Sequence, residues 1–208
     1  MTVRQHRGDL PDLSRYTDSV AIDTETMGLN PHRDRLCVVQ LSNGDGSADV
    51  VQIPRDHGQG PTDAPNLKAL LANHKITKIF HFARFDLAAL YNALGVMPEP
   101  VYCTKIASRL SRTYTDRHGL KDLVREVLNV DLSKQQQSSD WGAPSLTEAQ
   151  LAYAASDVLH LHALRERLDM MLAREGRLDL AQACFAFLPT RAKLDLQGWE
   201  AEDIFAHS

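Results

Sequence analysis

The sequence predicts an α/β protein whose central mixed β-sheet is flanked by helices. Two observations lead to this prediction. Short apolar runs of strand length, with helices between them, fill the first half of the chain, whereas apolar residues at helical spacing fill the second half. The chain has 208 residues, which suits one large domain, and no repeat, low-complexity segment or long linker divides it. We therefore expect one domain over residues 1–208 with an all-helical C-terminal half.

Four segments have the composition of strands, because each is a short apolar run bounded by turn or loop residues. They are 19–23, 36–41, 49–53 and 78–82. The turn-rich sequence SNGDG at residues 42–46 joins the second run to the third. A short connection of this kind predicts an antiparallel hairpin.

Five segments have apolar residues at helical spacing: 66–73, 84–94, 104–111, 119–128 and 147–173. In the last of them the apolar residues recur at three- and four-residue steps, which predicts one long helix with a buried face. Those residues are Leu151, Ala154, Ala155, Val158, Leu161 and Leu164. Thr147 followed by Gln150 resembles a capping box, so we expect this helix to begin there.

Acidic residues lie at the end of a predicted strand, at a strand-to-helix junction and on the buried face of a predicted helix. Asp23 and Glu25 are i and i+2 at the end of a strand, so both carboxylates point to one face and can reach one cation. Asp86 lies at a strand-to-helix junction. Taken singly, these acids are better explained as a solvated strand end and as a first-turn acid favoured by the helix dipole. Asp157 follows Tyr153 at i+4 on an inward-facing helix, where a buried carboxylate needs a partner or a metal.

The acidic motifs taken together indicate a protein family more specifically than any one of them does alone. The segments AIDTETMGL, HFARFDLAAL and YAASDVLHL resemble the three motifs of the DEDD exonuclease superfamily. Ala152 stands where one subgroup has histidine, and Tyr153 follows it, so the chain resembles the tyrosine (DEDDy) subgroup. The stretch HGLKDLVREVLNVDLSKQQQSSDW resembles ribonuclease D-like enzymes. Within that family, RHGLKDL, SKQQQSSDW and the terminal DIFAHS resemble the nano-RNase C group.

This resemblance implies a ribonuclease H-like exonuclease fold, 3′–5′ hydrolysis of very short RNA including dinucleotides, and a ring-shaped homo-octamer. It also implies two divalent cations held by four carboxylates: Asp23 bridges both ions, Glu25 and Asp157 favour the ion on the water side, and Asp86 helps to hold the second. An all-oxygen site favours Mg²⁺ or Mn²⁺ over zinc. Tyr153 is a poor free base at neutral pH because tyrosine has a reference pKa near 10, so we assign it to orienting the water.

Other residues are candidates for substrate binding. Leu29 is expected as a wedge against the terminal bases, His81 and Arg84 as contacts of the 3′ nucleotide or its phosphate, and the basic, aromatic segment RTYTDRH as a site for a 5′ phosphate. Solvated surface or helix capping explains each candidate equally well, and Trp141 is expected to be partly core. The full set is Thr26, Met27, Gly28, Leu29, His81, Arg84, Arg112, Tyr114, Arg117, His118, Lys134, Gln137 and Trp141.

The charge composition bears on the length of nucleic acid that the protein would bind. The 23 Lys and Arg residues are outnumbered by 27 Asp and Glu, for a formal charge of −4. A protein that tracks long nucleic acid usually carries a basic domain, so either the basic residues cluster locally or the substrate is short. There is no apolar run of membrane-spanning length and no signal-peptide pattern, and three scattered cysteines suggest neither zinc nor disulfides, so we expect a cytoplasmic protein that does not enter a membrane.

Two alternatives stay open at this stage. The same chemistry would serve ribonuclease D-like trimming of longer RNA 3′ ends, or a DNA exonuclease. A protein of a different class, a catalytically inactive nucleic-acid-binding adaptor, would be expected to lack one or more of the carboxylates. Finally, Trp199, Ile204 and Phe205 lie in an acidic C-terminal tail, 195–208. We expect this tail to be docked, either on its own domain or at a subunit interface.

Overall fold

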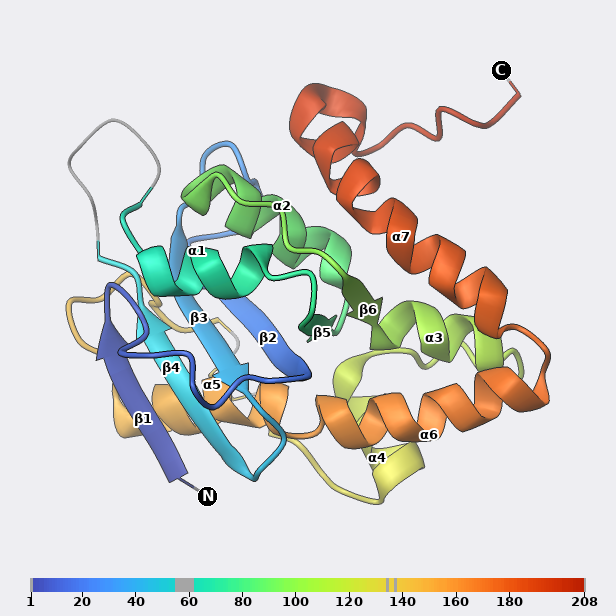
Figure 1. Ribbon diagram of the computed structural model, residues 1–208, viewed down its shortest axis with the longest axis horizontal. Coiled ribbons are helices and arrows are strands. Elements are labelled where there is room, and N and C mark those ends of the chain that lie inside the picture. The colour runs from blue at the N-terminus through green and yellow to red at the C-terminus, as the bar shows by residue number, and fades with distance from the viewer. Residues whose placement is uncertain (1, 55–61, 134, 137, 208) are drawn as a thin grey trace.

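The computed structural model describes residues 2–54, 62–133, 135–136 and 138–207. Its centre is a six-stranded sheet in the order β1-β4-β3-β2-β5-β6 (Figure 1). The β2–β3 and β3–β4 pairs are antiparallel, and the other three pairs are parallel. The strands are β1 (Thr2–Arg7), β2 (Ser19–Thr26), β3 (Leu36–Ser42), β4 (Ser47–Gln52), β5 (Thr77–Phe80) and β6 (Val101–Cys103). The mixed sheet and the β3–β4 hairpin confirm the sequence predictions.

Strand β1 was not predicted, because its sequence TVRQHR has no apolar run. It pairs in parallel with β4 at the sheet edge, and its polar side chains meet a buried carboxylate there. Asp49 on β4 accepts hydrogen bonds from Arg4 Nε at 2.8 Å and from the Tyr16 hydroxyl at 2.7 Å, and its Oδ1 lies 2.8 Å from His6 Nε2. Charge pairing therefore holds this strand where apolar burial holds the others. Strand β6, only three residues long, was also missed.

Seven α-helices are present in the described ranges, and a π-helical turn follows the last of them. They are α1 (Pro65–Ala72), α2 (Ala83–Leu94), α3 (Thr104–Ser111), α4 (Leu120–Leu128), α5 (Glu148–Leu159), α6 (Leu161–Arg174) and α7 (Leu178–Leu194), with the turn η1 at Asp195–Trp199. Helices α1 and α2 lie over one face of the sheet and α5 covers the other (Figure 1). Helices α3, α4, α6 and α7 pack together beyond the β6 end, which confirms the all-helical C-terminal half.

The single helix predicted over 147–173 is wrong, because a turn at His160 (φ −103°, ψ −4°) interrupts it and divides it into α5 and α6. Helix α5 packs on the sheet, whereas α6 packs on α3 and α4. Because the apolar spacing continues across the junction, the sequence pattern does not locate this change of partner. The predicted N-terminus is confirmed: Thr147 and Gln150 form a reciprocal capping box.

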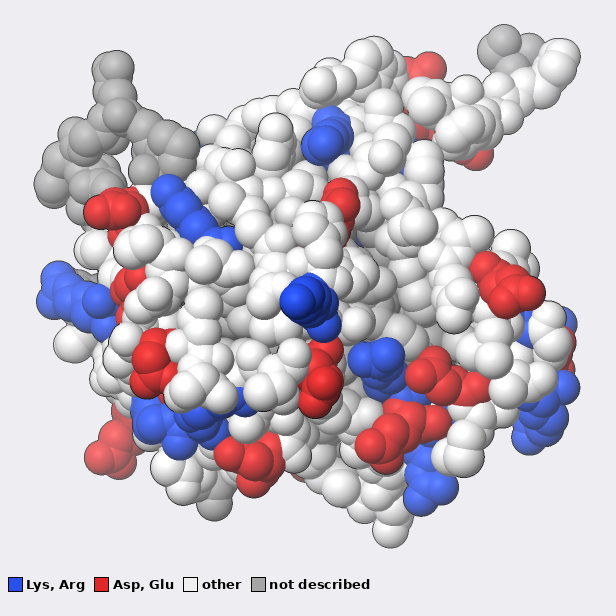
Figure 2. Space-filling model, viewed as in Figure 1, with Lys and Arg blue, Asp and Glu red and all other residues white. Residues whose placement is uncertain are grey.

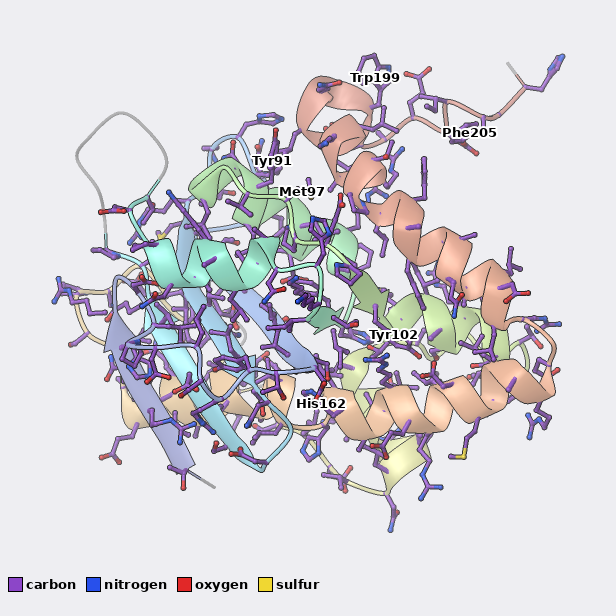
Figure 3. All side chains as sticks on the ribbon, in the orientation of Figure 1. Tyr91, Met97, Tyr102, His162, Trp199 and Phe205 are labelled. Atoms are coloured by element: carbon purple, nitrogen blue, oxygen red, sulfur yellow. The ribbon has the colours of Figure 1, made fainter. Side chains whose placement is uncertain are left out.

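The C-terminal segment leaves the body of the molecule after η1 (Figures 1 and 3). Asp195 is buried and pairs with Arg84 and Arg191, so the first part of the predicted tail is docked on its own chain. Farther along, Ile204 and Phe205 are exposed, and Phe205 makes one edge contact with Phe187 at a ring-centroid distance of 5.9 Å. None of the described helices combines the length and the apolar character that a membrane span requires.

Candidate active site

Three carboxylates converge between the sheet and α5. Asp23 and Glu25 lie on β2, and Asp157 lies near the C-terminal end of α5. One oxygen atom of each side chain lies within 4.8 Å of one oxygen of each of the other two. Asp86, in the first turn of α2, is buried beside this group and accepts a 2.7 Å hydrogen bond from the Thr24 hydroxyl. The four acids predicted from the motifs are therefore neighbours in space.

Burial raises the pKa values of all four acids, and the charges of neighbouring acids add to this effect for Asp23, Glu25 and Asp86. Burial, followed by the charges of Asp157 and Asp86, raises the pKa of Glu25 to about 9. Burial also raises the pKa of Asp157 to about 7, an effect that the neighbouring Tyr153 hydroxyl partly offsets. The pKa of Asp86 rises to about 7 through burial, and the pKa of Asp23 rises well above its ordinary value through burial and the charges of the other three acids. Without a counter-charge, the cluster therefore retains protons near neutral pH.

The donor set fits a pair of hard divalent cations. All the converging atoms are carboxylate oxygens, which Mg²⁺ and Mn²⁺ prefer. The cluster also lines an open pocket of about 340 Å³, so a substrate can reach it. Bound cations would favour the ionised carboxylates and so oppose both the burial and the repulsion that raise these pKa values.

A residue that the sequence analysis did not consider orients Asp23. Gln40 on β3 is completely buried, and its Nε2 donates a 2.7 Å hydrogen bond to Asp23 Oδ2. This bond fixes the rotation of the carboxylate and so decides which oxygen faces the cluster. A signal was present in the sequence, since Gln40 is the one amide in the otherwise apolar strand segment LCVVQL.

The 3′–5′ exonuclease family profile matches residues 10–173, which include all four acids. The chain belongs to the 3′–5′ exonuclease family. Ribonuclease D from Acidiphilium cryptum is 38% identical over 160 residues, which are 77% of this chain and 39% of that protein. The chain thus spans about two fifths of the length of the curated ribonuclease D relatives that it matches.

Two solved structures resemble this exonuclease over its whole length. Brucella melitensis NrnC with bound Mg²⁺ has a TM-score of 0.94 and 63% identity, and the match covers 100% of each chain. Brucella melitensis NrnC bound to pGG has a TM-score of 0.95 and 64% identity, again over 100% of each chain. The ribonuclease H-like exonuclease fold and the predicted resemblance to ribonuclease D-like enzymes and nano-RNase C are confirmed.

The pocket of this exonuclease is also lined by Tyr153 and by two lysine side chains. Burial, and then the charge of Asp157, raises the pKa of Tyr153 above its already high ordinary value, so the hydroxyl stays protonated at neutral pH. Its ring lies 6.0 Å from that of Trp141, which is buried as expected for a core residue. Lys105 and Lys121 also line the pocket. Neither lysine was among the predicted contacts: Lys105 lies outside the quoted motifs, and Lys121 lies inside RHGLKDL, where the sequence analysis selected only Arg117 and His118.

The residues after the D-x-E motif form a turn beside this pocket. Thr26 donates its hydroxyl proton to the Gly28 carbonyl at 2.5 Å. A Cβ on Gly28 would lie 2.4 Å from the Asp34 carboxylate, so a larger residue at this position would have to displace the Asp34 side chain. Met27 is half exposed, and Leu29 is 84% exposed, which leaves the Leu29 side chain free to act as the predicted wedge.

His81 lines the pocket beside Thr104, with His81 Nδ1 2.9 Å from Thr104 Oγ1. When the Thr104 hydroxyl donates to the Phe80 carbonyl at 3.2 Å, Nδ1 is the donor in this contact and Nε2 is free to accept. Burial and the charge of Lys105 lower the pKa of His81 to about 3, so Nε2 remains an unprotonated acceptor. A neutral acceptor can receive a hydroxyl proton from a ribose, whereas it cannot donate to a phosphate oxygen.

Other predicted contacts lie away from the acids. Arg84 is held by Asp195 and by the Glu200 carbonyl, and it lines a neighbouring pocket. Arg112 is completely buried against Glu126 and Ser108, which differs from the surface position expected for a 5′-phosphate contact. Arg112 donates a 3.0 Å hydrogen bond to the Arg117 carbonyl and so holds the RTYTDRH segment in place. In this segment Tyr114 and Arg117 are exposed, and His118 Nδ1 lies 2.9 Å from Ser108 Oγ. Lys134 and Gln137 lie outside the described residues.

Proposed function

We propose that this chain is a two-metal-ion 3′–5′ exoribonuclease, one domain over residues 1–208, that releases 5′-mononucleotides from short RNA, including dinucleotides. The observation that carries the proposal is the convergence of Asp23, Glu25 and Asp157 in one open pocket, with Asp86 buried beside them. Whole-length similarity to Brucella melitensis NrnC, one structure of which contains pGG, supports the dinucleotide substrate. A cytoplasmic setting is part of the proposal and fits the three free cysteine thiols.

The residues divide the work of phosphodiester hydrolysis. The four carboxylates would hold two divalent cations, which supply activation of a water and stabilisation of the leaving 3′ oxygen. Gln40 orients the Asp23 carboxylate, and Thr24 orients that of Asp86. The protonated Tyr153 hydroxyl positions the attacking water rather than removing its proton. Lys105 and Lys121 contribute positive charge at the pocket, where a phosphate must approach the acids.

Three features favour short RNA over long nucleic acid or DNA. The pocket is small, at about 340 Å³. The chain has a formal charge of −4, and basic and acidic side chains are intermingled on the face shown in Figure 2, which is the α1–α2 side of the sheet. A protein that follows a long nucleic acid usually carries a basic domain. The Nε2 acceptor of His81 suits a ribose hydroxyl. An inactive adaptor is disfavoured because all four carboxylates are present and close together.

A degradation time course tests the proposal. Under Mg²⁺ and then Mn²⁺, 5′-labelled RNAs from a dinucleotide to a long oligomer are compared with matched DNAs. We expect the dinucleotide RNA to be consumed fastest, with mononucleotides as products and no cleavage in EDTA. Faster trimming of the long RNA would favour the ribonuclease D-like alternative, faster loss of DNA would favour a DNA exonuclease, and binding without cleavage would favour the adaptor.

We also propose a ring-shaped homo-octamer in which the C-terminal segment contacts a neighbouring subunit. Support comes from Ile204 and Phe205, large apolar side chains that the described part of this chain leaves exposed. A chain that stops at Ala201 keeps the Arg84–Asp195 pair and loses Phe205. We expect light scattering to show a smaller particle for this variant than for the full chain. A monomeric full chain, or an unchanged particle after truncation, would contradict the proposal.

A further inference from the structure

Phe82 adopts a backbone conformation that a bulky residue normally avoids. Its φ is 65° and its ψ is 47°, the left-handed region, where the Cβ of an ordinary residue meets its own carbonyl. Asn129 is the one other non-glycine residue with a positive φ in the described ranges, and asparagine tolerates this region. Phe82 therefore carries a backbone strain that its own side chain creates.

Burial of the ring does not compensate for this strain. The Phe82 side chain is 44% exposed, although its neighbours Phe80 and Ala83 are completely buried. An aromatic ring that served the core would be placed among them. Strain that persists at an exposed side chain is typical of a position kept for binding rather than for packing.

The position of the ring indicates what it would bind. Phe82 joins β5 to α2, the helix that carries Asp86, and it lines the pocket that contains the carboxylate cluster. It also lines a second cavity of about 510 Å³, whose wall includes Leu29, Arg33 and Arg84. The ring thus stands between the catalytic acids and a cavity that has both apolar and basic walls.

A lysine ammonium group lies beside the Phe82 ring. The Lys105 ammonium lies 4.2 Å from the centre of the Phe82 ring, and Lys105 lines the carboxylate pocket as well. A flat apolar surface beside a positive charge matches one nucleotide, because the base can stack on the ring while the phosphate meets the ammonium. Phe82 and Lys105 are therefore separate from the four acids that would hold the metal ions.

We propose that Phe82 is the platform on which a substrate base stacks as the strand passes from the carboxylate pocket into the neighbouring cavity, with Lys105 against the adjoining phosphate. This inference rests on the proposed exonuclease function and identifies a substrate-positioning pair within it. The ligand is an oligoribonucleotide, and stacking makes the contact tolerant of base identity. In this left-handed conformation the ring is partly exposed and lines both pockets.

Binding and stability are measured on the same variants. With a fluorescent 5′-phosphorylated diribonucleotide in Ca²⁺, we expect Phe82→Gly to raise the Kd about 5- to 30-fold, the loss expected for one base–aromatic stack. Phe82→Trp keeps a ring and should bind nearly as the unmodified protein does, and Lys105→Gln should weaken binding and reduce its salt dependence. With Mg²⁺, KM should rise for Phe82→Gly while kcat changes little.

Thermal unfolding separates this role from a structural one. Glycine accepts the left-handed region without strain, so the Tm of Phe82→Gly should equal or exceed that of the unmodified protein even though binding is weaker. Tyr91 is a matched control, since it is a partly exposed aromatic residue on α2, the helix that Phe82 precedes. Its ring centre lies 5.9 Å from the Lys193 ammonium, and it lies outside the carboxylate pocket. Tyr91→Ala should leave the Kd unchanged.

Two results would overturn the inference: a lower Tm with unchanged Kd for Phe82→Gly, or equal losses of binding for Phe82→Gly and Tyr91→Ala. Failure of the exonuclease proposal would look different. In that case the unmodified protein itself would not degrade RNA with Mg²⁺, whereas failure of the Phe82 inference leaves its activity intact.

Discussion

Asp23→Asn is expected to remove RNA hydrolysis, with kcat lower by a factor of about 100 or more at saturating Mg²⁺. Asp23 is the carboxylate whose pKa is raised by the charges of all three others, so it lies centrally among them. Asparagine has nearly the same volume and removes one negative charge from the site. Its amide oxygen can still accept the bond from Gln40, so the packing around β2 should persist.

The control is an acid in the same pocket that lies outside the cluster. Asp122 lines the pocket and pairs with Arg125, and Asp122→Asn should keep nearly full activity. The Tm of metal-free Asp23→Asn should be no lower than that of the unmodified protein, because one source of buried repulsion is gone. Near-normal kcat in a folded Asp23→Asn protein would exclude Asp23 as an essential ligand.

The sequence predicted the elements whose stability comes from apolar burial. Strand β3 is buried at every position, and its apolar run is visible in the sequence. Strand β1 has no such run, because the bonds of Arg4 and His6 to Asp49 hold it in place, and those partners are distant in the chain. Electrostatic pairing between distant residues leaves no periodic signal.

The break between α5 and α6 escaped prediction for a different reason. Local spacing reports that a helix has a buried face but not which neighbour buries it, and here the neighbour changes at His160. Tertiary contacts override local pattern at such a junction.

In the site, the four acids were found because their order along the chain matches a family motif. Gln40 and Lys105 were not found, since the fold alone brings Gln40 to Asp23 from β3 and Lys105 to the pocket from α3. Phe82 lies inside a recognised motif, yet its importance depends on a backbone angle that the residue type argues against. Supporting residues of a site are thus less visible in a sequence than its ligands.

Removal of the divalent cations is expected to make the stability of the protein depend on pH. In the metal-free protein, burial raises the pKa values of Asp86 and Asp157 to about 7, and burial with neighbouring charge raises that of Glu25 to about 9. In the unfolded chain these groups titrate near pH 4. Between these limits the native state binds more protons than the unfolded state, so the free energy of unfolding falls as pH rises.

The contribution of this cluster to the stability of the metal-free protein should therefore be largest below about pH 4 and be lost progressively toward pH 9, the window set by these pKa values. Divalent cations bind the ionised carboxylates of the native state, so Mg²⁺ should change Tm little at pH 5. At pH 8, an Mg²⁺ concentration about 100 times its Kd should raise Tm by about 5–10 °C. Thermal unfolding in EDTA and in Mg²⁺ across this range measures both trends, with Asp23→Asn as the control that should show a smaller Mg²⁺ effect. If metal-free Tm rose from pH 5 to pH 8, or if Mg²⁺ stabilised both proteins equally, the carboxylate cluster would not be the site where the cations bind.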